Sequence, residues 1–180
     1  STDPRSAGNG SLMRVAPVPL RYAGNPSEAV RKAAESSKTT HGARAAVDAC
    51  RYFAALIVGA LQGRDKGELL APAFAPEGVD WSAEPLEPDI ARIAAGSFKT
   101  KGAHEIRASG FVVHTLEAAL WAFHNSADFR EGALLAVNLG EDADTTGAVY
   151  GQLAGAYYGL EGIPPQWRDT VARREEIARM

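Results

Sequence analysis

Three acidic side chains and two hydroxyls lie within the ten residues from Asn138 to Gly147, between an apolar run and a strongly helical one. Crowded carboxylates raise one another's pKa unless a cation neutralises them. Asp142, Asp144 and Thr145 offer only oxygen atoms, which suit Mg²⁺ or Mn²⁺ and argue against zinc. Alternatively, Asp142 or Asp144 caps the following helix by accepting a backbone N–H. The segment alone does not decide between a metal site and a cap.

A second polar segment near the N-terminus has the composition of an anion-binding loop. Gly8-Asn9-Gly10 permits positive φ angles and thereby exposes successive backbone N–H groups to phosphate oxygens. Ser6 and Ser11 add hydroxyl donors, and Arg14 could supply charge. The alternative is an ordinary flexible turn, which an isolated Gly-Asn-Gly favours.

His41 and Phe111 are the other residues that we expect to touch a ligand. His41 follows two threonines at the start of a predicted helix. Phe111 precedes another helix and could present its ring to a base or a ribose, although core packing is the default for a phenylalanine. The other histidines have no spacing that, with a nearby carboxylate, makes a convincing metal site.

Helices must position all of these residues, because the apolar side chains recur at helical spacing and no strand alternation or hairpin signal is present. Asn25 should cap the first predicted helix, and Thr40 the second. The sequence therefore predicts an all-α bundle. The predicted helices span residues 26–37, 41–62, 65–74, 89–96, 113–124, 128–138, 144–158 and 165–179.

Glycines recur every four residues in one of these helices, at Gly147, Gly151 and Gly155, and Gly159 should end it. Each interior glycine costs about 1 kcal/mol relative to alanine. Close approach of a second helix usually offsets this cost. We therefore expect a buried central helix that holds the acidic segment rigidly at its N-terminal end. A membrane pairing motif is the other known use of such spacing, but the flanking acidic residues argue against it.

The composition limits the possible classes of protein. The 180 residues, 46% of them hydrophobic, suffice for one domain over residues 1–180. A net charge of -3, with acidic and basic residues mixed along the chain, gives no basic groove for nucleic acid. The longest apolar run, Phe53 to Leu61, is far shorter than the ~20 residues that span a membrane. Cys50 is the single cysteine, which excludes an internal disulfide. Together these features favour a soluble protein of the cytoplasm.

Four motifs that occur in this order resemble the ADP-ribosylglycohydrolase family, which includes the dinitrogenase reductase-activating glycohydrolases. They lie at residues 8–14, 40–41, 113–122 and 140–159, so the resemblance spans nearly the whole chain. It implies an all-α bundle around a two-metal centre, usually of Mg²⁺ or Mn²⁺. Members of the family remove ADP-ribose from proteins or small molecules.

The resemblance also implies a role for most of the candidate residues. Asp142, Asp144 and Thr145 match the family's C-terminal metal ligands, and His41 matches a position beside the ribose or adenine of the ligand. The residues that match the diphosphate and ribose loop are Ser6, Gly8, Asn9, Gly10 and Ser11.

The chain also departs from the family's pattern. Glu141 and Ala143 differ from the commonest wording of the metal motif, but both aspartates and the first threonine are kept. The family's upstream portion carries a Thr-Asp-Asp-Thr metal motif and an acidic residue near the scissile bond. This sequence contains neither, and Thr2-Asp3 is a poor substitute. We therefore expect the C-terminal part of an ADP-ribosylglycohydrolase domain, whose catalytic acidic residue lies upstream.

Three hypotheses of function follow. The first is metal-dependent hydrolysis of the bond between ADP-ribose and its acceptor, with the missing ligands supplied by an upstream portion that can be a separate polypeptide. The second is a module that binds ADP-ribose or regulates, without catalysis. The third is a helical interaction domain in which the acidic turn only caps a helix.

Overall fold

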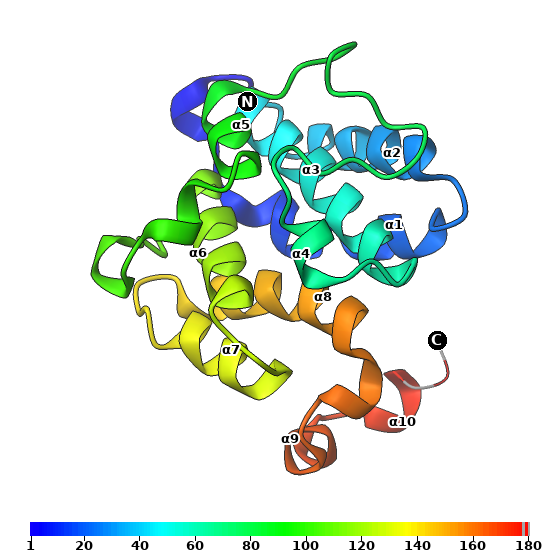
Figure 1. The fold of residues 1–180 in the computed structure, drawn as a ribbon, viewed down its shortest axis with the longest axis vertical. Coiled ribbons are helices and arrows are strands. Elements are labelled where there is room, and N and C mark those ends of the chain that lie inside the picture. The colour runs from blue at the N-terminus through cyan, green and yellow to red at the C-terminus, as the bar shows by residue number, and fades with distance from the viewer. Residues whose placement is uncertain (178, 180) are drawn as a thin grey trace.

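A computed structural model describes residues 1–177 and 179 (Figure 1). The described residues form helices and no β-strand, so the prediction of an all-α fold is confirmed. No helix among them is long and apolar enough to cross a membrane. The α-helices are α1 (Pro17–Arg21), α2 (Pro26–Lys38), α3 (Arg44–Leu61), α4 (Lys66–Leu69), α5 (Pro88–Ala94), α6 (Val112–His124), α7 (Phe129–Val137), α8 (Ala143–Gly162), α9 (Pro165–Thr170) and α10 (Arg174–Ile177). Four short 3₁₀ helices are η1 (Pro4–Ser6), η2 (Asn9–Arg14), η3 (Ser97–Thr100) and η4 (Ala103–Glu105).

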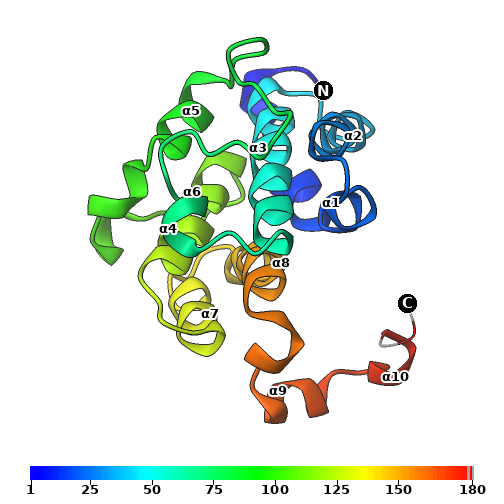
Figure 2. The ribbon, with the colours of Figure 1, turned by 45° about the vertical axis from the view of Figure 1, so that its right-hand side comes forward.

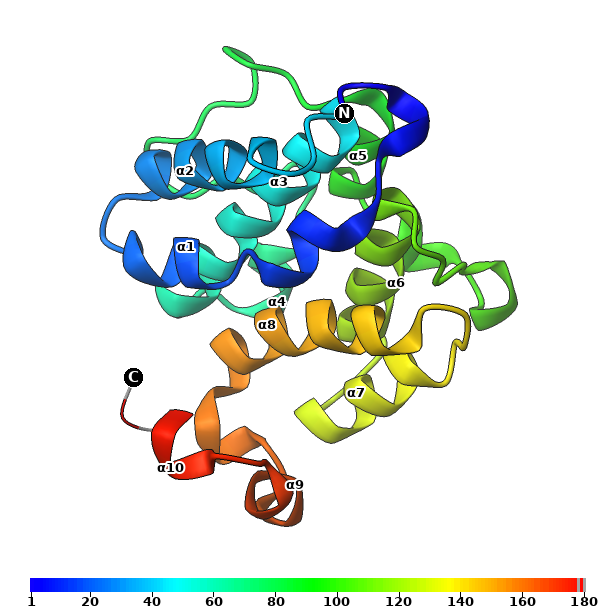
Figure 3. The ribbon, with the colours of Figure 1, turned by 180° about the vertical axis from the view of Figure 1, so that it is seen from behind.

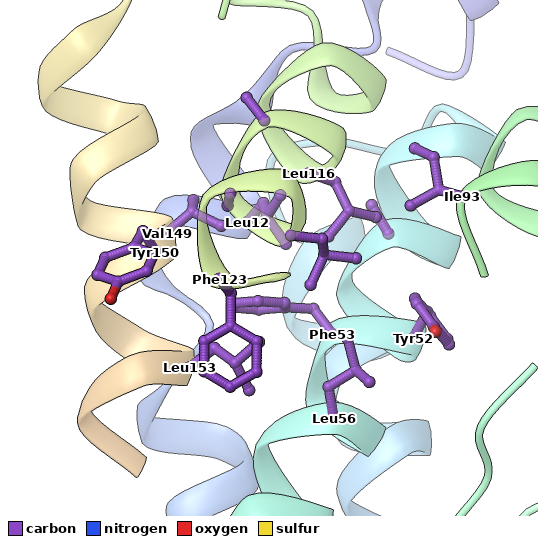
Figure 4. Close-up of a cluster of buried hydrophobic side chains, with 14 of the residues drawn as sticks. Leu12, Tyr52, Phe53, Leu56, Ile93, Leu116, Phe123, Val149, Tyr150 and Leu153 are labelled. Carbon is purple, nitrogen blue, oxygen red and sulfur yellow. The ribbon is translucent and has the colours of Figure 1, made fainter. Parts of the chain in front are cut away.

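The centre of the fold is α3, in which every residue from Ala46 to Ala60 is buried. Helices α2, α6 and α8 and the 3₁₀ helix η2 pack around it. Figure 4 shows part of the resulting core, where side chains from α3, α6 and α8 meet in one cluster. The expectation that α8 is the buried central helix is therefore wrong. Helix α8 buries only Thr146, Val149, Tyr150, Leu153 and Ala154.

Local capping explains where several helices begin. The Asn25 side chain accepts a hydrogen bond from the backbone N–H of Glu28, as the sequence predicts for α2. Asp65 and Glu68 form a capping box at α4. The Asp128 carboxylate accepts from the backbone N–H of Glu131 at α7. Such caps satisfy backbone donors that the first turn of a helix leaves without partners.

Helix α3 begins at Arg44, and not at His41 as predicted. Its N-cap is Ala43, and the Thr40 hydroxyl bonds elsewhere, to Arg14 and to the His41 ring. The backbone N–H of His41 donates instead to the carbonyl of Ser37, at the end of α2. His41 consequently lies in the short link between α2 and α3.

The C-terminal segment also differs from its prediction. A continuous helix over 165–179 was expected, but α9 and α10 are separated by an extended Val171 and by Arg173 with φ of 57°. Neither helix contains a fully buried residue, and a helix without a buried face is marginal in water. Residues 178 and 180 lie outside the described part. Figure 2 shows α9 and α10 extending away from the other helices. The helix predicted over 65–74 is likewise shorter, and the prediction missed α1.

The glycines of α8 are not at a helix–helix contact, with one exception. A Cβ placed on Gly147 would lie 2.9 Å from Val137 Cγ1 in α7, whereas one placed on Gly151 or Gly155 would meet no atom within 4 Å. Gly159, with φ of 69°, interrupts the regular helix as expected. The expected close approach of a second helix is therefore wrong for Gly151 and Gly155.

Replacing Gly151 or Gly155 with alanine should stabilise this chain by up to about 1 kcal/mol each, because alanine has the higher helix propensity and the added methyl group meets nothing. Gly59→Ala in α3 is the matched contrast. Its Cβ would lie 2.5 Å from Phe74 Cζ and 2.7 Å from Leu69 Cδ2, so we expect a loss of roughly 1–3 kcal/mol. Urea unfolding of the three variants measures both effects. Destabilisation by Gly151→Ala would show that this face is packed after all.

Candidate functional site

Three loops that are distant in sequence meet at the N-terminal end of α8. Gly8 and Phe111 form an isolated antiparallel bridge, flanked by a 3.1 Å hydrogen bond from Asn9 N to Gly110 O. The backbone N–H of Asp142 donates to Ala108 O at 2.9 Å. The loop before α6 thus lies between the N-terminal loop and the acidic segment and holds both. Figure 3 shows the N-terminal segment crossing the back of the molecule beside α6 and α8.

Asn9 joins these loops through its side chain. The residue is only 8% exposed, and its amide nitrogen donates to Thr115 Oγ1 at 2.8 Å and to Asp142 Oδ2 at 2.6 Å. Both amide hydrogens are therefore used within the protein. Thr115 Oγ1 in turn donates to Ser109 O at 3.0 Å. Asn9 thus fixes the position of a candidate metal ligand.

The hydrogen bond from Asn9 is the main reason why the pKa of Asp142 lies below its ordinary value, and burial acts in the opposite direction. Asp142 occupies the N-cap position of α8, but its side chain accepts no backbone N–H of that helix. The interpretation of Asp142 as a helix cap is therefore wrong.

Asp144 and Thr145 lie in the first turn of α8, directly after Asp142. Asp144 is exposed, and its Oδ1 accepts from the adjacent backbone N–H of Thr145 at 2.9 Å. Thr145 Oγ1 lies 3.9 Å from Met13 Sδ, on the N-terminal segment. Thr146 Oγ1 is buried and has no hydrogen-bond partner within the described residues.

The donor chemistry of this turn fits a hard divalent cation, because carboxylate and hydroxyl oxygens are the ligands such ions prefer. It fits only in part, since no group of three His, Cys, Asp or Glu side chains among the described residues could hold a metal ion. Asp142 and Asp144 are two carboxylates without a third.

The positive φ angles predicted for the glycines of the N-terminal loop are absent. Gly8 has φ of -71°, and neither Gly8 nor Gly10 has a positive φ. A Cβ on Gly10 would instead lie 2.9 Å from His41 Cε1 and 3.0 Å from His41 Nε2. On Gly8 the corresponding nearest atom is His41 Nε2, at 3.5 Å. The missing side chain of Gly10 therefore makes room for the imidazole ring.

Some polar groups of the same loop are already bonded within the protein. The N–H of Gly8 donates to Ser6 O at 2.8 Å, and that of Asn9 to Gly110 O. Ser11 is 2% exposed, and Ser37 Oγ lies 2.9 Å from its hydroxyl oxygen. Ser6 is exposed at the end of η1. Of the two predicted serine donors, only Ser6 is at the surface.

Phe111 is half-buried at the N-cap position of α6. Its ring lies edge-to-face on the His114 ring, with centroids 5.2 Å apart, and His114 Nδ1 lies 2.7 Å from Ser109 Oγ. Burial lowers the pKa of His114. The sequence analysis missed Thr115 and the Ser109–His114 pair. A hydroxyl within an otherwise apolar helix was the signal for Thr115.

The arrangement defines a class of protein, an all-α domain that presents a glycine loop beside two carboxylates. The family model for ADP-ribosylglycohydrolase matches residues 1–180. A solved structure described as an ADP-ribosylglycohydrolase-related protein complex superposes with a TM-score of 0.86 at 45% identity, covering 98% of this chain and 59% of that one. The chain belongs to the ADP-ribosylglycohydrolase family.

Curated relatives share the same region. The chain is 44% identical over 178 residues to the ADP-ribosylarginine hydrolase Tri1 of Pseudomonas putida, covering 99% of this chain and 46% of that protein. It is 34% identical over 180 residues to the Tri1 hydrolase of Serratia proteamaculans, covering all of this chain and 47% of the relative. It is 29% identical over 172 residues to the ADP-ribosyl-[dinitrogen reductase] glycohydrolase of Rhodospirillum rubrum, covering 94% of this chain and 52% of the relative. The chain thus spans about half the length of these relatives.

Replacing Asn9 with alanine should raise the pKa of Asp142 toward its ordinary value, because the donor that favours the charged carboxylate is lost. We also expect a loss of roughly 1–3 kcal/mol in the free energy of unfolding. Thr115→Val is the control, since it removes the other acceptor of the same amide and keeps the bond to Asp142. An NMR titration of Asp142 separates the variants. An unchanged pKa in Asn9→Ala would contradict the assigned cause.

Gly10→Ala should displace the His41 ring and weaken ADP-ribose binding, while Gly8→Ala should leave both nearly unchanged. The physical reason is the 2.9 Å approach to His41 Cε1 at Gly10, against ordinary contact distances at Gly8. Calorimetry with ADP-ribose and the chemical shifts of the His41 ring measure the two effects. Equal losses of ADP-ribose binding in both variants would indicate that the backbone conformation of the glycines matters, and not the space that Gly10 leaves for His41.

Proposed function

We propose that this chain provides the ligand loop and one side of the metal site of a hydrolase that removes ADP-ribose from modified arginine side chains of proteins. The observation that carries the proposal is the direct bond between the two motifs. Asn9, inside the glycine loop, donates to Asp142, at the head of the acidic motif. This bond holds the proposed diphosphate loop beside the proposed cation-binding turn.

The names of the relatives support the substrate class. Two of them are ADP-ribosylarginine hydrolases, and a third is an ADP-ribosyl-[dinitrogen reductase] glycohydrolase. All three names describe the release of ADP-ribose from a modified acceptor. Arginine is the acceptor in the two relatives of higher identity, and we carry it to this chain as a proposal.

We propose Mg²⁺ or Mn²⁺ as the cofactor, with Asp142, Asp144 and Thr145 as the ligands supplied by this chain. Such metal ions would supply Lewis-acid chemistry, orienting the ribose hydroxyls and polarising a water molecule. The residues around them have separate tasks. Asn9 favours the charged form of Asp142. We propose that the half-buried Phe111 ring would contact the ribose at the edge of the loop.

The remaining metal ligands and the catalytic acidic residue must come from elsewhere. We propose that they belong to an upstream portion, present in the same polypeptide or in a separate one. The chain's match to about half the length of its relatives supports this assignment. So does the pair of carboxylates without a third among the described residues.

Metal binding tests the assigned ligands. Mn²⁺ should bind this chain weakly, because three oxygens from one turn leave at least half of an octahedral shell to solvent. Adding the upstream portion should tighten binding by at least tenfold, and Asp142→Asn or Asp144→Asn should abolish that gain. Ser109→Ala, which changes a hydroxyl outside the acidic turn, is the control. Tight two-site binding by this chain alone would refute a shared site.

Release of ADP-ribose from an ADP-ribosylarginine protein tests the activity. We expect turnover when the chain and the upstream portion are combined with Mg²⁺ or Mn²⁺, and none from either part alone. Binding of ADP-ribose without hydrolysis by the combined parts would favour the alternative, a binding or regulatory module. The absence of both would leave only a structural role.

A further inference from the structure

The ring of His41 makes one side-chain hydrogen bond within the described residues, between its Nδ1 and Thr40 Oγ1 at 2.8 Å. The other ring nitrogen, Nε2, faces both Gly8 and Gly10. Which of the two nitrogens carries the proton decides whether His41 offers that loop a donor or an acceptor. The neighbours of Thr40 determine the answer.

Thr40 also accepts a hydrogen bond from Arg14, whose Nη2 lies 2.8 Å from Oγ1. A guanidinium group can only donate, so this bond uses an oxygen lone pair of the hydroxyl and leaves its hydrogen for another acceptor. His41 Nδ1 is the acceptor within reach. If Thr40 donates to Nδ1, the hydrogen of the neutral imidazole must be on Nε2.

Further contacts fix both Arg14 and the backbone of His41. Arg14 Nη1 donates to Ser36 Oγ and Nη2 to Ser36 O, both at 3.1 Å, at the C-terminal end of α2. Carbonyl groups at a helix C-terminus attract positive charge, which holds the guanidinium there. The backbone N–H of His41 donates to Ser37 O at 2.7 Å. The end of α2 therefore sets both the position of the ring and the donor that acts on Thr40.

We propose that Arg14 and Thr40 are positioning residues that orient the His41 ring so that Nδ1 accepts from the Thr40 hydroxyl and a hydrogen is on Nε2. This N–H faces the loop at Gly8 and Gly10, where it donates to an oxygen of the bound ligand, from either its diphosphate or a ribose. The identity of the ligand rests on the proposed function, whereas the tautomer does not. With its hydrogen on Nε2, His41 favours a ligand that presents a hydrogen-bond acceptor to this nitrogen over one that presents a donor.

The tautomer can be measured directly by ¹⁵N NMR of the histidine side chains at neutral pH. The wild-type chain should show a protonated Nε2 and an unprotonated Nδ1 at His41. Thr40→Val should lose this preference, and Thr40→Ser, which keeps the hydroxyl, should retain it. Arg14→Gln should weaken it. A protonated Nδ1 in the wild type, or an unchanged tautomer in Thr40→Val, would overturn the proposal.

Thr39→Val is the matched control. Thr39 Oγ1 also accepts from Arg14 Nη2, at 3.3 Å, but its own hydroxyl donates to Ser36 O and makes no bond to His41. The tautomer should therefore survive this substitution. Loss of the preference in Thr39→Val would show that a general disturbance of the link after α2, and not the Thr40 hydroxyl, controls the ring.

Titration with ADP-ribose tests the ligand contact. Thr40→Val should weaken binding by roughly five- to tenfold, the worth of one hydrogen bond, while Thr40→Ser and Thr39→Val stay within about twofold of the wild type. A shift of Nε2 with ADP as well as ADP-ribose, but not with adenosine, assigns the acceptor to the diphosphate; a shift with adenosine too assigns it to the adenosine ribose, and a shift with ADP-ribose alone assigns it to the second ribose. Binding without any shift of Nε2 would overturn the contact. If the wild type binds neither ADP nor ADP-ribose, the proposed function fails, and the tautomer measurement still decides the positioning role.

Discussion

The arrangement of the site depends on the buried amide of Asn9. Its two hydrogens join the N-terminal loop to Thr115 in α6 and to Asp142 at the start of α8. Leaving a buried amide without hydrogen-bond partners costs free energy, so arrangements in which Asn9 keeps both partners are favoured over those in which it loses one. The acceptor at α8 is a carboxylate, and a hydrogen bond to a charged group is stronger than one between neutral groups. One side chain thus fixes the loop and the charge of the acidic turn together.

The other side of the same loop is occupied by His41. The absence of a side chain at Gly10 lets the imidazole ring approach, and Arg14, in the helical turn that follows, returns to the end of α2 beside the ring. The loop therefore lies between two helix ends, the C-terminus of α2 and the N-terminus of α8. Neither end reaches the other directly, and the short 3₁₀ helix η2 connects them while burying Leu12 in the core. Stability of the core and geometry of the site are coupled through this one turn.

Local features were predictable from the sequence, and non-local ones were not. Asn25 and the helix it caps depend on contacts within one turn, and the all-α class follows from the spacing of apolar residues. The choice of α3 over α8 as the buried centre depends on which helices surround each, which no local pattern records. The same holds for Asn9, whose partners lie 106 and 133 residues away. The glycine spacing of α8 gave a wrong prediction of a close helix contact. This spacing is typical of packed helices, but at Gly151 and Gly155 a Cβ would meet no atom within 4 Å.

The acidic turn combines features that oppose one another. The N-terminus of α8 carries the positive end of the helix dipole, which favours the carboxylates and disfavours a cation between them. The hydrogen bond from Asn9 favours the charged form of Asp142 without a cation. The turn can therefore fold with the Asp142 carboxylate charged before any metal binds. It can retain a divalent ion firmly only when further negative ligands offset the dipole and complete the shell. In the proposed site, this chain would therefore fix the geometry of the acidic turn, while the proposed upstream ligands would determine whether a metal ion is bound.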